Sequence, residues 1–162
     1  MKKWWWLLLL IPFIVIWQSV NIYQSTLADE KVLHKQAEAR AKKIVKGIKV
    51  NKVEHFHGKD SYQVVHAINE DGEAVYVWVP DNNKKKPVIK KASEGWTEER
   101  VKEQVISERN PIEIIDIRLG MMSGTPLWEV KYVDNNDQYT YYYMNFQNGE
   151  LVKRYSIKEK KT

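Results

Sequence analysis

Hydrophobic and polar residues follow two different periods along this chain, and the two periods occur in the same order twice. Between Asp29 and Gly47, apolar residues recur every three or four positions, which predicts an amphipathic helix that ends at the glycine. The stretch that follows alternates between apolar and polar residues, a pattern typical of antiparallel strands. We expect these strands at 49–56, 61–68 and 73–79, with a further edge strand within 84–92.

The same order returns about 65 residues later. Thr97 is a favourable N-cap for a helix that runs to Arg109, with acidic residues in its first turn, where the helix dipole favours them. The chain is therefore predicted to be α+β, with two units at 29–95 and 96–162, each a helix packed on a three- or four-stranded antiparallel sheet. In the second unit, strands are expected at 112–119, 127–133, 139–146 and 150–157, with a turn at 121–126.

One helix can cover only one face of each sheet, so each unit keeps a second, uncovered face. If the valines of 73–79 face the first helix, then Tyr76 and Trp78 point to the other side. The same alternation turns three residues of the second unit away from its helix: Tyr139, Tyr141 and Tyr143.

These large aromatic side chains are the strongest functional candidates. Tyr and Trp dominate the binding energy of protein interfaces, so the rings can form a groove for a partner. They can instead pack the two units together or stack on sugars, and the sequence leaves these alternatives open. The candidate partner-binding residues are Tyr76, Trp78, Trp96, Tyr139, Tyr141 and Tyr143.

The first 28 residues predict a membrane anchor and a short linker. No charged residue occurs between Lys3 and Asp29, and a helix over residues 4–23 would be about 30 Å long, enough to cross a bilayer. Lys2 and Lys3 favour a cytoplasmic N-terminus, with the rest of the chain outside a single-pass anchor. A cleaved signal peptide that ends near 26–28 is the alternative, and it also exports the chain.

Composition narrows the chemistry. The 162 residues include no cysteine, which excludes disulfides, redox thiols and thiolate metal sites, and which fits an exported domain on a Gram-positive cell surface. The net charge is +5, and it falls to +3 once Lys2 and Lys3 are left out. Because the remaining charges are mixed, we expect no nucleic acid partner; a salt-screened attraction to anionic lipid or wall polymer is compatible with this charge.

We expect no catalytic, metal or cofactor site. His55 and His57 lie two apart on a predicted strand and could begin a metal site, but no third ligand accompanies them. Ser123 lies in a glycine-rich turn without a nucleophile motif or a histidine in the same unit. The acidic loop at 134–137 lacks the glycine and the distal glutamate of a calcium loop. The protein is therefore predicted not to be an enzyme.

Two short motifs complete the pattern of the second unit: Trp128-Glu129-Val130 in its second strand and Asn148-Gly149-Glu150-Leu151-Val152 at its last hairpin. A helix followed by three or four antiparallel strands with these motifs resembles the PepSY repeat, which has a cystatin-like fold. With an N-terminal anchor and two such units, the whole chain resembles the YpmB-type or TseB-like family of Gram-positive rods. The first unit departs from the repeat, since its final hairpin at 82–84 has no glycine.

The resemblance implies a membrane-anchored regulator of cell wall elongation that contacts a penicillin-binding protein, and it supplies no catalytic residues. Two alternatives stay open. The protein could inhibit proteases or act as a chaperone of exported enzymes, using hairpin tips at 120–126 and 134–137. It could also bind an anionic wall polymer or lipid through Lys84–Lys86.

Overall fold

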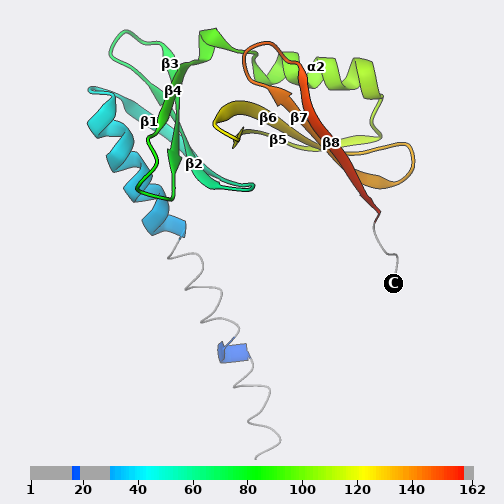
Figure 1. Cartoon of the computed structure of the whole chain (residues 1–162), viewed down its shortest axis with the longest axis horizontal. Helices are drawn as coiled ribbons and strands as arrows, with labels where there is room; N and C mark the ends of the chain where they lie inside the picture. Colours follow the sequence, from blue (N-terminus) through cyan, green and yellow to red (C-terminus); the bar gives the residue numbers. More distant parts are fainter. Residues whose placement is uncertain (1–15, 19–29, 159–162) are drawn as a thin grey trace, which may run out of the picture.

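Two four-stranded antiparallel sheets, each accompanied by one helix, make up residues 30–158 (Figure 1). The computed structural model describes residues 16–18 and 30–158. The strands follow one another in space as in sequence, β1-β2-β3-β4 and β5-β6-β7-β8. Their bounds are β1 Lys49–His57, β2 Ser61–Ile68, β3 Ala74–Pro80, β4 Val88–Lys91, β5 Glu113–Met122, β6 Thr125–Val133, β7 Gln138–Asn145 and β8 Leu151–Lys158.

The predicted membrane anchor falls almost wholly outside the described residues. Only residues 16–18 of the expected span at 4–23 are described, and they are helical. Within the described part of the chain, none of the helices has the length and apolar character needed to cross a bilayer.

The first helix, described over residues 30–44, covers one face of the first sheet. Ala37 and Ala41 are buried against Val65, Val75 and Val77, in a cluster that also includes Val79. Small alanines let the helix approach the β-branched valines closely, so the contact is dense. The valines of β3 therefore face this helix, which was the condition for Tyr76 and Trp78 to point to the other side. The helix ends slightly before the predicted Gly47, which follows in a turn.

The second helix, α2 Glu98–Arg109, lies along one face of the second sheet (Figure 1). Thr97 is its N-cap, and the Thr97 hydroxyl accepts the backbone N–H of Arg100 at 3.2 Å. Val101 and Val105 are fully buried against the sheet. Asn110 ends the helix in the left-handed conformation, with φ 44°, immediately before a proline that cannot continue it. A short 3-10 turn, Ala92–Glu94, leads from β4 toward this helix.

The β5–β6 hairpin is tighter than the predicted turn at 121–126. Strand β5 continues to Met122 and β6 starts at Thr125, so only Ser123 and Gly124 form the turn. Both have positive φ, 51° and 81°, which is the geometry of the two-residue turns that match strand twist. Ser123 is therefore one of the two residues that form this tight turn.

One hydrophobic core joins the two sheets. Phe56 and Trp78 of the first sheet belong to the same buried cluster as Leu119 of β5 and Phe146, which follows β7. The Phe56 ring lies so close to Gly120 that a Cβ there would be 2.4 Å from its edge, so only glycine fits. The uncovered face of the first sheet is thus occupied by the second unit.

Candidate functional site

Tyrosine rings line the face of the second sheet that α2 leaves uncovered. We call this surface the tyrosine face; it consists of Lys131, Tyr139, Tyr141, Tyr143, Lys153 and Tyr155. Tyr141 of β7 and Tyr155 of β8 are register partners, and their rings stack at 5.1 Å between centroids, 14° from parallel. Tyr143 also stacks on Tyr155, at 6.0 Å. The strand register therefore builds a continuous ring array.

Two lysines lie over these rings. The Lys131 ammonium is 5.0 Å from the centre of the Tyr139 ring and 5.6 Å from that of Tyr141. The Lys153 ammonium is 5.2 Å from the centre of the Tyr155 ring. Each contact is of the cation–π type, which attracts the ammonium to the negative ring face. The tyrosine face is thus both aromatic and basic.

A buried polar contact supports the inner part of this face. Glu129 is only 4% exposed and is neutralised by Arg118, whose Nε donates to its carboxylate at 2.7 Å. The neighbouring Tyr143 is buried as well, and its hydroxyl lies 3.3 Å from that of Tyr155. Burial raises the pKa of Tyr143 far above its usual range, so the ring stays neutral. Tyr143 therefore supports the face from below.

The other candidate aromatics lie elsewhere. Trp78 is fully buried, and Tyr76 is half-buried beside it; both rings meet Phe146 edge-on, at 5.6 Å and 6.0 Å respectively. Trp96 packs at the β7–β8 turn, where its backbone carbonyl accepts the indole N–H of Trp128. Tyr76 and Trp78 thus pack the two units together, whereas Trp96 packs within the second unit. Of the six candidates, only Tyr139 and Tyr141 are partly exposed on the tyrosine face.

Sequence reasoning missed two parts of this surface. Tyr155 lies on the last strand, in register with Tyr141, and Lys131 covers two of the rings. The alternation along residues 151–158 could have predicted the position of Tyr155, because it places Tyr155 on the same face of the strand as Lys153. The register between strands, which sequence alone does not supply, was needed to pair it with Tyr141.

A polar cluster lies on the same inner face of the first sheet as Tyr76. The Glu54 carboxylate is 2.7 Å from the His66 imidazole and 2.7 Å from the Lys52 ammonium. The hydrogen bond from His66, together with Lys52, lowers the pKa of Glu54 to about 2 despite its partial burial. The His66 ring meets Tyr76 edge-on, at 5.0 Å. This cluster lies at the margin of the contact between the two units.

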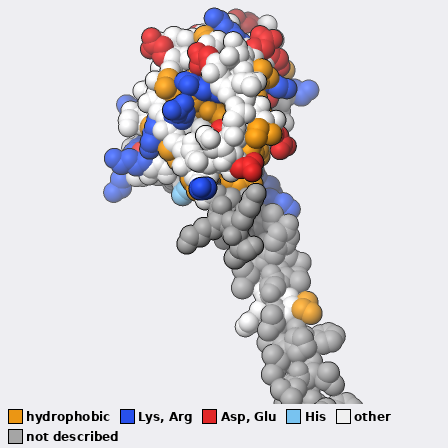
Figure 2. Space-filling model, turned by 90° about the vertical axis from the view of Figure 1, so that its right-hand side faces the viewer, with side chains coloured by type: hydrophobic (Ala, Val, Ile, Leu, Met, Phe, Trp, Pro, Cys, Tyr) orange, Lys and Arg blue, Asp and Glu red, His pale blue; other side chains and the backbone are white. Residues whose placement is uncertain are grey.

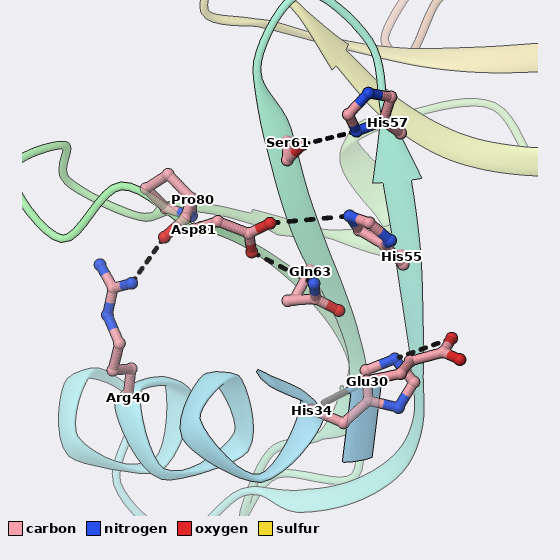
Figure 3. Close-up of polar contacts among 9 residues, drawn as sticks. All are labelled: Glu30, His34, Arg40, His55, His57, Ser61, Gln63, Pro80 and Asp81. Carbon is pink, nitrogen blue, oxygen red and sulfur yellow. Dashed lines mark hydrogen bonds and ion pairs between the residues drawn. The ribbon is translucent and has the colours of Figure 1, made fainter. Parts of the chain in front are cut away.

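The remaining histidines are engaged separately (Figure 3). His57 shares a hydrogen bond with Ser61 at 2.7 Å, whereas His55 points to Asp81 at 3.6 Å and His34 to Glu30 at 3.8 Å. No group of three potential ligands among the described residues is arranged to hold a metal ion.

Asp81 and Arg40 fix the end of β3 to the neighbouring strands and to the first helix, respectively. Asp81 also accepts the buried amide of Gln63, at 3.1 Å. Arg40 of the first helix donates to the Pro80 carbonyl at 2.6 Å, which ties the helix to the end of β3 (Figure 3). These two hydrogen bonds stabilise the fold of the first unit.

The fold and the tyrosine face together define an α+β protein with an aromatic, basic sheet surface of the kind that proteins use to bind other proteins. Comparison with known proteins gives the family. Residues 36–80, from the first helix to the end of β3, match the model of the cell wall elongation regulator TseB-like domain. A curated relative from Bacillus subtilis (strain 168), described as "probable cell wall elongation regulator TseB", is 35% identical over 144 residues, which is 89% of each chain.

The solved structure of the YpmB protein from Bacillus subtilis is also similar. It superposes with a TM-score of 0.73 at 35% sequence identity, over 76% of this chain and 97% of that one. The chain therefore belongs to the TseB-like family of cell wall elongation regulators.

Proposed function

We propose that this protein is a membrane-anchored, non-enzymatic regulator of cell wall elongation that binds a penicillin-binding protein outside the membrane. Membership of the TseB-like family supports the cell wall role. The anchor at 4–23 rests on its apolar sequence and on the lysines before it. In this proposal the units at 29–95 and 96–162 are two PepSY-like, cystatin-like copies on one single-pass anchor. An anchor confines both partners to one membrane surface, so a modest interface is sufficient.

The observation that carries the proposal is the tyrosine face. Tyr139, Tyr141 and Tyr155 present aromatic area at low conformational cost, because tyrosine has few rotatable bonds and these rings are already stacked. Lys131 and Lys153 have no carboxylate partner among the described residues, so they remain available to acidic groups of a partner. The expected partner surface is apolar with acidic residues at its edge.

Crosslinking in living cells tests the proposal with the full-length chain. A photoreactive residue at position 141 should capture a penicillin-binding protein. Tyr139→Ala should reduce capture from a crosslinker at 141 at least tenfold if its ring is an interface hot spot, since 1.4 kcal/mol is tenfold in affinity. Ile106→Ala is the matched control, because Ile106 is also a large exposed side chain, 47% accessible, but lies on α2.

The outcomes are distinct. Equal capture by both variants would show that the Tyr139 ring is not an interface hot spot, and no capture from position 141 would place the interface elsewhere. Capture of a protease or of another exported enzyme would support the inhibitor or chaperone alternative instead. Capture of wall polymer or lipid alone, lost when Lys84–Lys86 are neutralised, would support a polymer-binding protein.

A further inference from the structure

A polar cleft with a volume of about 370 Å³ opens at the carboxyl end of α2. Three elements line it: the last turn of α2 with Arg109, the β6–β7 hairpin with Asp134 and Gln138, and β8 with Arg154 and Ser156. Arg154 is the register partner of Tyr142, whose hydroxyl donates to Glu108 of α2, so the cleft lies on the helix side of the sheet, opposite to the tyrosine face. Figure 2 looks at this end of the molecule, where basic side chains lie among acidic, hydrophobic and uncharged groups.

The acidic groups of this cleft are already satisfied. Asp134 accepts the backbone N–H groups of Asn136 and Gln138, at 2.8 Å and 3.1 Å, and the hydroxyl of Thr140, at 3.1 Å. These bonds shape the hairpin and occupy the carboxylate. Glu108 likewise accepts the Tyr142 hydroxyl at 2.9 Å and a side-chain amide of α2 at 2.6 Å. Because both carboxylates already accept hydrogen bonds, we do not expect Asp134 or Glu108 to bind a cation.

The basic groups of the cleft are only partly satisfied. Arg154 makes no hydrogen bond or ion pair with any residue that the structure describes, although its charge helps to lower the pKa of Asp134 across the cleft. The Arg109 guanidinium lies 5.0 Å over the Tyr142 ring, donates one long bond, 3.3 Å, to the Tyr142 hydroxyl and forms a long ion pair, 3.9 Å, with Glu108. Its Nε–H is buried without a partner among the described residues, an arrangement that costs free energy unless a ligand accepts the hydrogen bond.

We propose that this cleft binds a phosphate group. The donors left available are the guanidinium groups of Arg109 and Arg154, which line the cleft from α2 and from β8 and can each present a fork of N–H groups to phosphate oxygens, whereas the Ser156 hydroxyl and the Asn136 and Gln138 amides are already engaged. The source can be free phosphate, a phosphodiester in a polymer or a lipid headgroup, since all three present the same oxygens. This site is separate from the tyrosine face, so it stands independently of the proposed partner.

Titration of the full-length chain with inorganic phosphate, in an uncharged detergent and at constant ionic strength, tests this site. The probe is the Nε–H NMR signal of each arginine, and those of Arg109 and Arg154 should shift and saturate together. Arg154→Ala should weaken phosphate binding about tenfold or more, because a charge-assisted forked contact is lost. Lys153→Ala should change it less than about twofold, although it removes the same charge from the adjacent position, because Lys153 lies on the opposite face of β8.

Several results would overturn the proposal: no saturable shift, equal weakening by both variants, which indicates a diffuse electrostatic effect, or acetate binding as tightly as phosphate. A phosphate-diester probe and phosphatidylglycerol vesicles, compared with phosphatidylcholine vesicles, then identify the source. Arg154→Lys keeps the positive charge but loses the forked pair of N–H donors of the guanidinium group, so this variant should bind phosphate more weakly than the wild type. Arg154 is exposed on an edge strand, so these variants are expected to fold.

Discussion

Phe146 connects the two sheets, and its replacement by alanine measures how strongly they are coupled. Its side chain is fully buried between the β7–β8 turn and β3, edge-on to the rings of Trp78 and Tyr76. It also fills the space beside Gly95, where a Cβ would lie 2.3 Å from the ring. Truncation of a phenylalanine in such a site costs about 3–5 kcal/mol. The two edge-to-face contacts account for about 0.5–1.5 kcal/mol each within that total.

Urea unfolding of the full-length chain gives the measurement. Tryptophan fluorescence reports on the surroundings of seven tryptophans, with Trp78 at the contact among them, whereas far-UV circular dichroism reports on both sheets. Phe146→Ala should lower the free energy of unfolding by about 3–5 kcal/mol, and the two probes should no longer show one transition, because the sheets lose their shared core.

Two control variants define the scale. Phe146→Leu keeps most of the apolar volume and should cost less than about 1.5 kcal/mol, well below the cost of alanine. Ile112→Ala removes a side chain that is 61% exposed and should stay within about 0.5 kcal/mol of the wild type. If Phe146→Ala behaved like Ile112→Ala, the proposed coupling through this ring would be refuted.

Three further predictions follow from local geometry. Gly120→Ala should lower the free energy of unfolding by about 1–3 kcal/mol, because its Cβ would lie 2.4 Å from the Phe56 ring; an unchanged melting temperature would contradict this packing. Glu54→Gln should remove about 1–2 kcal/mol at pH 7, because the lowered pKa of about 2 stabilises the folded state above the ordinary value of 4.5 and this contribution is lost as pH falls toward 2. Its stability should therefore vary less between pH 5 and 2 than that of the wild type, and parallel curves would argue against the Glu54–His66 contact. Thr97→Ala should cost about 1 kcal/mol by urea unfolding, while Thr97→Ser should cost little, since serine keeps the capping hydroxyl.

Periodicity predicted the order of strands and helices well, because both sheets obey simple alternation. The valines of β3 face the first helix, and Tyr139 and Tyr141 face away from α2, as the period of two requires. The β5–β6 turn was predicted too long because its glycines resemble a loose loop. Only the positive φ values of Ser123 and Gly124 identify the tight turn.

Long-range arrangements were beyond the sequence. That the uncovered face of the first sheet meets the second unit depends on Phe56 fitting over Gly120, a contact between residues far apart in the chain. The cleft at the end of α2 depends on the β7–β8 register, including a shift between Tyr143 and Met144, which places Arg154 on the side of α2. A shift by one residue would have exchanged the two faces of β8.

Strand β8 is where the two proposed sites can influence each other. Its alternate residues contribute to opposite faces: Lys153 and Tyr155 to the tyrosine face, and Arg154 and Ser156 to the cleft. It is an edge strand whose residues are all exposed, held to the sheet by β7 alone, so its backbone is the least constrained part of either site. A partner that stacks on Tyr155 would order this strand and with it the Arg154 guanidinium, which would reduce the entropic cost of binding an anion. Coupling of this kind must be reciprocal, so a bound phosphate should strengthen capture from position 141 by the same factor. Independence of the two measured affinities would mean that β8 is already rigid and that the faces act separately.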